Sequence, residues 1–252
     1  MSGQHPSRIS LGQYADRFRN EMIPLANRFC YYSASAPLSE DDRKDYLDGP
    51  LAALPPVIAA RLPEIRILLV PYLEKADQPS SAAVPLVSTE RPREANALSS
   101  GAVFDKSGAV LAFAVKDAEM ADYHYRFYHA IAGLVAGPRG EHVPANYVKL
   151  LRQELAGGVH GEVDDPGWRL KLELTDSDIK NSKRRSKRFT QYCRQSFVDT
   201  LTLYMHGICC DIDVETGPRQ LPSNYLRKRL KLLRDLYPPP PGYSVFPEDS
   251  RS

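Results

Sequence analysis

The chain has 252 residues, of which 42% are hydrophobic and 25% are charged, and its formal net charge is +2. This composition is typical of a globular protein and excludes collagen-like, coiled-coil and disordered chains. The longest apolar runs are much shorter than the roughly 20 residues that span a bilayer, so we expect no membrane partner. The first ten residues lack the apolar core of a secretory signal, which predicts a cytoplasmic location.

The first predicted element is a helix near the N-terminus. Leu11, Tyr14 and Phe18 repeat at helical spacing, so a helix is expected to begin near Leu11. Pro24 is expected to kink or end it, because proline lacks the backbone N–H that a helix needs. Further along, Ser39 precedes an acidic residue by three positions, which is a typical arrangement for a helix N-cap.

The middle of the chain predicts strands around a long loop. Residues 64–71 are rich in Ile, Leu and Val and are expected to form a buried strand. Residues 75–100 contain three prolines and show no periodicity, so they predict a long surface loop. Two apolar runs within residues 101–115 flank a turn that ends at Gly108, which predicts a β-hairpin with a positive φ at this glycine.

Helical patterns dominate the second half. Periodic apolar positions and the proline and glycine residues around them predict helices over residues 117–136, 144–156, 178–205 and 223–236. Residues 168–174 alternate apolar and charged side chains, which is the pattern of a half-buried strand. The chain is therefore expected to be an α+β protein with a helix-rich body and a small, mainly antiparallel β-sheet.

The expected organisation is one large domain with two tails. Residues 11–236 are expected to form a single α+β domain, and residues 1–10 to be disordered. Residues 237–252 are rich in proline and are expected to form a rigid strap against the body. Within them Pro240–Tyr243 matches the PPxY pattern that WW domains bind, which is the alternative interpretation.

One strand and helix resemble part of a known enzyme class. The strand within residues 101–115 precedes a helix that contains His129-Ala130-Ile131-Ala132-Gly133. This unit resembles the HExxH helix of zincin metallopeptidases of the gluzincin type, in which two His bind zinc and Glu activates water. The resemblance covers residues 101–165, and it departs from the motif because Ala130 replaces the general base and Gly133 the second ligand. It implies a zincin-like scaffold that has lost its catalytic residues.

The alternative is a zinc-dependent peptidase with a rebuilt ligand set. Its ligands would be His129, Glu162 and either His206 or His160, because imidazole and carboxylate groups both bind Zn²⁺. The segment 206–215 also concentrates His, Cys and Asp in a short span. We expect no cofactor on the first interpretation and zinc on the second.

Residues 166–235 form a basic segment that is unrelated to the catalytic motifs. Residues 166–235 carry 15 Lys and Arg against 8 Asp and Glu, whereas residues 1–165 carry 17 against 21. Such an asymmetry points to a partner surface better than the net charge does. Its expected contact residues are Lys180, Lys183, Arg184, Arg185, Lys187, Arg188, Arg227, Lys228, Arg229, Lys231 and Arg234.

The sequence therefore favours a non-catalytic interaction protein, an adaptor or a regulator. An acidic protein surface is the expected partner, because the net charge is small and no aromatic signature for bases accompanies the cations. Binding of nucleic acid is the alternative, since phosphates also attract clustered lysine and arginine.

Overall fold

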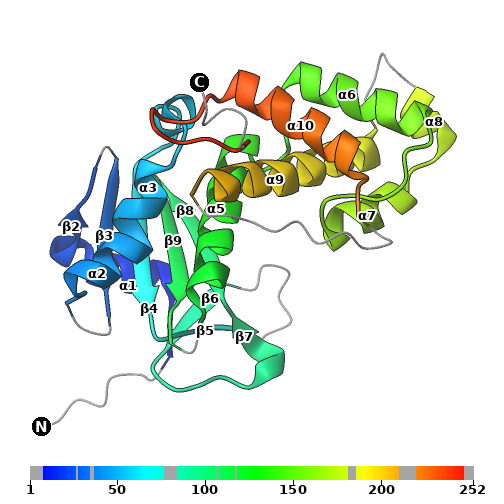
Figure 1. The fold of residues 1–252 in the computed structure, drawn as a ribbon. Helices are drawn as coiled ribbons and strands as arrows, with labels where there is room; N and C mark the ends of the chain where they lie inside the picture. The colour runs from blue at the N-terminus through cyan, green and yellow to red at the C-terminus, as the bar shows by residue number, and fades with distance from the viewer. Residues whose placement is uncertain are drawn as a thin grey trace, which may run out of the picture. The chain divides into compact units, whose positions relative to one another are not determined.

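A computed structural model describes residues 8–26, 28–34, 37–76, 84–106, 108–116, 118–180, 186–209 and 220–246 (Figure 1). Contacts within the chain divide it into two compact units. The first unit comprises Met1–Ala52 and Leu62–Phe127, and the second comprises Ala53–Arg61 and Tyr128–Ser252. In the part of the chain that is described, no helix is both long and apolar enough to cross a membrane.

A five-stranded mixed sheet forms the centre of the first unit. Its central strands β3, β4 and β9 run parallel, and the outer strands β2 and β8 are antiparallel to their neighbours. In spatial order the strands are β2 (Ile23–Pro24), β3 (Phe29–Ser33), β4 (Ile65–Val70), β9 (Gly108–Ala114) and β8 (Ser100–Asp105). The predicted strand over 64–71 and the predicted hairpin over 101–115 are thus confirmed. Gly108 has φ +133°, and a Cβ there would lie 2.1 Å from the Glu64 carbonyl oxygen, so the turn requires glycine.

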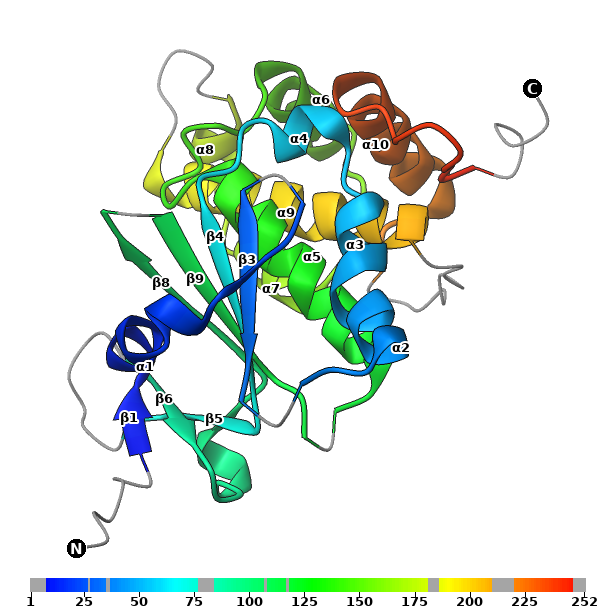
Figure 2. The ribbon, with the colours of Figure 1, turned by 90° about the vertical axis from the view of Figure 1, so that its left-hand side faces the viewer.

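All six side chains of β4 are buried, so both faces of the sheet are covered. On one face Leu68 and Val110 pack in a cluster with Leu11, which belongs to the helix α1 (Leu11–Arg17). On the other face Phe113 contacts Tyr123 at the beginning of α5 (Met120–Ala136), with ring centroids 5.2 Å apart. Figure 2 shows α1 in front of the sheet and α5 behind it.

A second, four-stranded sheet is entirely antiparallel. Its strands in spatial order are β1 (Arg8–Ser10), β6 (Pro85–Ser88), β5 (Tyr72–Lys75) and β7 (Ala97–Leu98). The predictions of a loop over 75–100 and of disorder over 1–10 are therefore wrong where these strands lie. Val87 is buried against the cluster under α1, which supplies the apolar contact that a short strand needs. Residues 1–7 and 77–83 lie outside the described residues.

Short helices connect the strands of the first unit. The predicted N-cap is confirmed, since the Ser39 hydroxyl accepts a hydrogen bond from the Asp42 N–H at 3.0 Å. The first helix is shorter than predicted, because it ends at Arg17 and Pro24 lies in β2. The remaining helical segments are η1 (Arg19–Glu21), α2 (Glu40–Arg43), η2 (Lys44–Asp48), α3 (Gly49–Ala52) and η3 (Glu94–Asn96).

Helices form most of the described part of the second unit (Figure 1). The longest, α9 (Lys187–Cys209), is in contact with α6, α7, α8 and α10. Its core residues include Phe189, Phe197 and Leu201, which are buried as their helical spacing predicts. The other helices are α4 (Pro56–Ala59), the end of α5, α6 (Ala145–Ala156), α7 (Asp165–Leu172), α8 (Asp176–Lys180) and α10 (Ser223–Leu236). The α+β class predicted from the sequence is confirmed.

The predicted strand over residues 168–174 is wrong, because most of this segment belongs to α7. Asp164 caps the helix through its side chain, which accepts a hydrogen bond from the Asp165 N–H, and Pro166 lies in the first turn. The alternating leucines do not mark one buried face, since Leu172 is 64% exposed. The cap at Asp164 therefore favours a helix here, and the alternation of apolar and charged residues does not reflect a strand.

The described part of the C-terminal tail lies against the second unit. Tyr237 and Phe246 are buried, and the Tyr204 hydroxyl donates a hydrogen bond to the Tyr237 carbonyl oxygen at 2.6 Å. Tyr243 is 37% exposed. Two buried aromatic side chains thus fix the proline-rich segment between them.

Candidate functional site

Helix α10 has two faces with different charge environments. Leu226, Arg229 and Leu233 are buried, and their spacing of three and four residues places them on one side of the helix. Lys228 and Lys231 are exposed on another side. One helix therefore carries both an interior cation and a set of surface cations.

The interior cation Arg229 is fully paired. Its Nε and Nη2 atoms donate to the Glu154 carboxylate at 3.0 and 2.6 Å, and its Nη1 and Nη2 atoms donate to Glu162 at 2.7 and 2.9 Å. Nη1 also donates to the Ser196 hydroxyl at 2.9 Å. The side chain is 0% exposed. A planar guanidinium can bind two carboxylates in this way because its donors point in fixed directions.

Glu162 is the carboxylate with the larger set of neighbours. It also accepts hydrogen bonds from the Tyr192 hydroxyl at 2.5 Å and from the Ser196 hydroxyl at 3.2 Å, and the Lys171 ammonium lies 3.6 Å away. Burial alone would raise the pKa of Glu162, but the Arg229 charge holds this pKa below its usual value. Burial lowers the pKa of the Lys171 ammonium, which the Glu162 charge opposes. Two carboxylates therefore face two cations in a balanced buried cluster.

The backbone around Glu162 holds this carboxylate in place. Gly161 has φ +81°, and a Cβ there would lie 2.3 Å from the Gln220 carbonyl oxygen, so only glycine fits this close approach. The Leu221 N–H then donates to the Glu162 carbonyl oxygen at 3.0 Å. The loop before α7 is thereby joined to the segment before α10, which carries Arg229.

These contacts correct one sequence prediction. Arg229 was expected to be a contact residue for a partner, but burial and two carboxylates make it part of the core. Lys183, Arg184 and Arg185 lie outside the described residues. Lys180 belongs to α8, and Lys187 and Arg188 are exposed in the first turn of α9.

The predicted metal ligands are not brought together. Both oxygens of Glu162 accept hydrogen bonds from Arg229, His129 is an exposed residue of α5, and the His206 ring packs 6.1 Å from the ring of Tyr128. The alternative ligand His160 packs against Trp168 at 4.6 Å. Across the described ranges, no three His, Cys, Asp or Glu side chains form a group that could hold a metal ion. Cys210, Asp211 and Asp213, which belong to the segment 206–215, lie outside those ranges.

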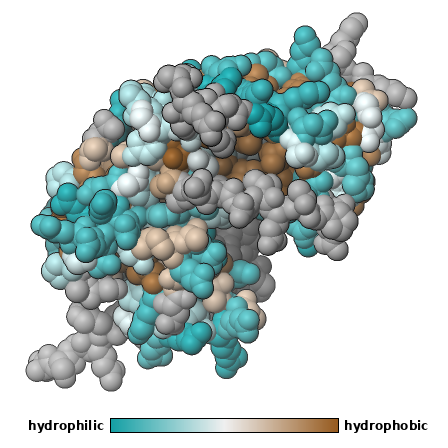
Figure 3. Space-filling view, viewed as in Figure 1, coloured by the Kyte–Doolittle hydropathy of each residue, from teal (hydrophilic) through white to brown (hydrophobic). Residues whose placement is uncertain are grey.

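The exposed cations of α6 and α10 form the candidate site, which we call the basic face. Helices α6 and α10 are in contact, and hydrophilic side chains cover this part of the surface in Figure 3. The basic face consists of the exposed residues Lys149, Arg227, Lys228 and Lys231. On these two fully described helices, the exposed acidic residue is Asp235, because Glu154 is buried. The net charge of this surface is therefore clearly positive.

Aromatic side chains orient part of the basic face. The guanidinium of Arg227 lies 5.1 Å from the centre of the Phe246 ring, and that of Arg234 lies 5.5 Å from it. The ammonium of Lys228 lies 5.1 Å from the centre of the Tyr225 ring. A cation above an aromatic ring keeps its charge. Among the described residues, none of the lysines at positions 149, 228 and 231 forms an ion pair.

The sequence prediction missed Lys149, although a signal for it was present. Tyr147, Val148 and Leu151 form the buried side of α6, so Lys149 has to point away from the core. The same reasoning identifies Arg229, because it lies three residues after Leu226 and four before Leu233. A count of charges that does not consider which side of the helix each residue occupies therefore places Arg229 on the surface by mistake and omits Lys149.

Comparison of the chain with protein-family models, with curated proteins and with solved structures found no match.

Proposed function

We propose that the protein is a non-catalytic interaction protein that binds an acidic protein surface through the basic face of α6 and α10. The observation that carries the proposal is the exposure of Lys149, Arg227, Lys228 and Lys231 on two neighbouring helices, against one exposed acidic residue, Asp235. Such a surface attracts an acidic partner over a distance of roughly 10 Å at ordinary ionic strength. Lys187 and Arg188 in the same unit add to this field.

An acidic protein fits this surface better than nucleic acid does. The net charge of the whole chain is +2, and the residues before the basic segment are mildly acidic, so a long polyanion meets repulsion away from the basic face. The aromatic rings at the basic face, Tyr225 and Phe246, lie under Lys228 and Arg227 and offer no stacking surface for bases. An acidic protein surface can bind here because it is compact and does not need aromatic rings on which to stack.

The non-catalytic part of the proposal rests on the residues of α5. Ala130 and Gly133 stand where the zincin motif requires the general base and the second ligand. Neither residue can perform that chemistry, because alanine cannot accept a proton and glycine has no side chain to bind a metal. On this proposal the β9–α5 unit serves as a scaffold.

The test compares two variants with equal numbers of neutralised lysines. In the first, Lys149, Lys228 and Lys231 are changed to Ser, and in the control the exposed Lys44, Lys75 and Lys106 of the first unit are changed to Ser. A short polyglutamate peptide and a duplex DNA serve as probes over a range of salt concentrations. We expect the first variant to bind polyglutamate about tenfold more weakly and the control to bind as the parent does, since each exposed ion pair contributes roughly 0.2–1 kcal/mol.

Two results would contradict the proposal. Equal polyglutamate affinity of both variants would show that the basic face is a solvated surface. Tighter binding of DNA than of polyglutamate, with an affinity that falls by a log–log slope of about 0.9 per phosphate contact, would assign the face to nucleic acid instead.

A further inference from the structure

The first unit contains a pocket at a distinctive point of its central sheet. Strands β4 and β9 are parallel neighbours, and the chain leaves their carboxyl ends toward opposite faces. After β4 it enters β5 of the second sheet, whose Leu73 packs on the face covered by α1. After β9 it enters α5, whose Tyr123 packs on Phe113 of the other face. This divergence opens a crevice beyond the strand ends, which is where open α/β sheets bind ligands.

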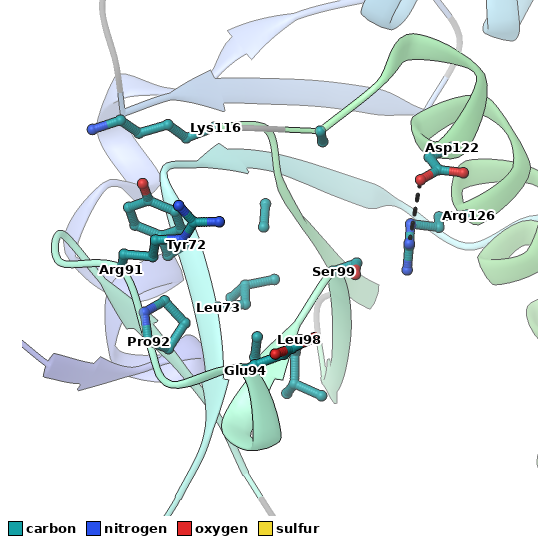
Figure 4. A pocket seen from close by; sticks show the side chains of 13 residues that line it. Tyr72, Leu73, Arg91, Pro92, Glu94, Leu98, Ser99, Lys116, Asp122 and Arg126 are labelled. Atoms are coloured by element: carbon teal, nitrogen blue, oxygen red, sulfur yellow. Dashed lines mark ion pairs between the residues drawn. The ribbon is translucent and has the colours of Figure 1, made fainter.

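The pocket at this crevice has a volume of about 570 Å³. That volume is within the range of small-molecule sites in proteins, roughly 300–1,000 Å³. Its lining comes from both diverging segments and from η3 and β7, and all of it belongs to the first unit. Leu73 and Leu98 supply an apolar wall (Figure 4). The small side chains of Ala114 and Ala118 also line the pocket.

The charged residues of the pocket are not balanced. Asp122 and Arg126 face each other at 3.8 Å and neutralise one another. Arg91 and Lys116 remain, against Glu94, and no ion pair among the described residues engages either cation. Figure 4 shows Arg91, Lys116 and Tyr72 on one side of the pocket and the Asp122–Arg126 pair on the other.

Tyr72 lies beside one of the two cations of that side. The Lys116 ammonium lies 5.5 Å from the centre of the Tyr72 ring, so it is held near the pocket and keeps its charge. Arg91 lines the same side from the loop before η3. Two cations from separate segments thus line one side of a pocket that also has an apolar wall, which is the combination that an amphiphilic anion needs.

We infer that this pocket binds a small organic anion, a phosphate or carboxylate compound, whose charged group lies between Arg91 and Lys116 and whose apolar part lies on Leu73 and Leu98. The site is independent of the basic face, because it lies in the other unit and shares no residue with it.

The test measures binding of AMP, adenosine and citrate to the full chain by calorimetry. AMP carries the phosphate, citrate carries carboxylates, and adenosine lacks the anionic group. We expect AMP or citrate to bind, and the one that binds identifies which anion the site prefers. The double variant Arg91→Gln with Lys116→Gln should bind that anion at least about tenfold more weakly, because charge-assisted hydrogen bonds are lost.

Matched variants separate this result from a general charge effect. The control Lys44→Gln with Lys106→Gln removes two exposed cations away from the pocket and should bind as the parent does. Ala118→Trp fills the pocket without changing its charge and should also abolish binding. The inference is overturned if neither anion binds, if adenosine binds as tightly as the preferred anion, or if the Arg91 and Lys116 variant keeps the affinity of the parent. Failure here leaves the polyglutamate result on the basic face unaffected.

Discussion

The inner and outer faces of α10 assign different roles to the same kind of residue. Arg229 is 0% exposed and binds Glu154 and Glu162, whereas its neighbour Lys228 is exposed above a tyrosine ring. A buried cation loses its hydration and requires carboxylates close by. An exposed cation keeps its hydration and can therefore exchange water for an incoming carboxylate. Burial, more than residue type, decides which cations are structural and which are available to a partner.

The largest expected effect is the loss of the inner cation. Arg229→Met leaves Glu154 and Glu162 buried without their partner and should lower the free energy of unfolding by about 3–5 kcal/mol. Lys228→Met on the outer face should change it by less than about 0.5 kcal/mol. Urea denaturation measures both. A loss below about 1 kcal/mol for Arg229→Met would show that the two faces do not differ as described.

The variant Arg229→Lys tests the geometry of the same cluster. Lysine keeps the charge but cannot donate to two carboxylates in a fork, so we expect a smaller loss of stability than for Arg229→Met. Stability equal to that of the parent would mean that charge alone holds the cluster together.

A pH effect should come from Asp199, which lies close to the buried cluster. Burial raises the pKa of this carboxyl from 3.8 to about 7, and the charges of Asp164 and Glu162 add to the effect, while Gln195 donates to Oδ1 at 2.7 Å and Arg229 opposes it. The other oxygen, Oδ2, is buried without a hydrogen bond in the described structure. The folded state thus holds this proton more strongly than the unfolded chain does.

The sign of the pH effect follows from this difference. As the pH rises from about 4 to 7, the unfolded chain has already released the proton and the folded chain has not, so the contribution of Asp199 to stability falls. Between pH 5 and pH 7 the loss amounts to about 2–3 kcal/mol, and Asp199→Asn should remove it. Asp235→Asn, an exposed control, should leave the pH profile of unfolding unchanged. Identical profiles for the parent and Asp199→Asn would refute this assignment.

The smallest of the stability effects concerns a single hydroxyl. Tyr192→Phe removes the hydrogen bond that Tyr192 donates to Glu162, and it should cost about 1.5 kcal/mol because the acceptor is charged. Tyr243→Phe removes a hydroxyl from a side chain that is 37% exposed and should have no measurable effect. Thermal unfolding compares the two. Equal melting temperatures would mean that the remaining partners, Arg229, Ser196 and Lys171, satisfy the carboxylate without Tyr192.

Local patterns in the sequence predicted most helices and the hairpin, because caps, breakers and spacing act over a few residues. Ser39, Gly108 and the leucines of α10 are examples of such local signals. The small second sheet could not be predicted, since β1 and β6 pair across about 80 residues of chain and each is too short to show a period. The strand prediction for residues 168–174 failed for the opposite reason. Apolar and charged residues alternate clearly there, but the segment belongs mostly to the helix α7.

Of the two candidate sites, the basic face could have been predicted from the sequence and the pocket could not. Assigning faces to α6 and α10 from the sequence would have identified Lys149 as a surface residue and Arg229 as a core residue. No sequence pattern would have placed Arg91 and Lys116 in the same pocket, because the pocket is created where β4 and β9 diverge. Interior pairing of charges and pocket formation depend on tertiary contacts, which spacing along the chain does not encode.

The most direct test of the account reverses charge at equal net charge. Changing Lys149, Lys228 and Lys231 to Glu alters the net charge by the same amount as changing Lys44, Lys75 and Lys106 to Glu, and all six side chains are exposed. We expect charge reversal on the basic face to abolish binding of polyglutamate and to create binding of polylysine, and charge reversal in the first unit to leave polyglutamate bound. If both variants lose polyglutamate equally, net charge governs the interaction and the basic face is not a binding surface.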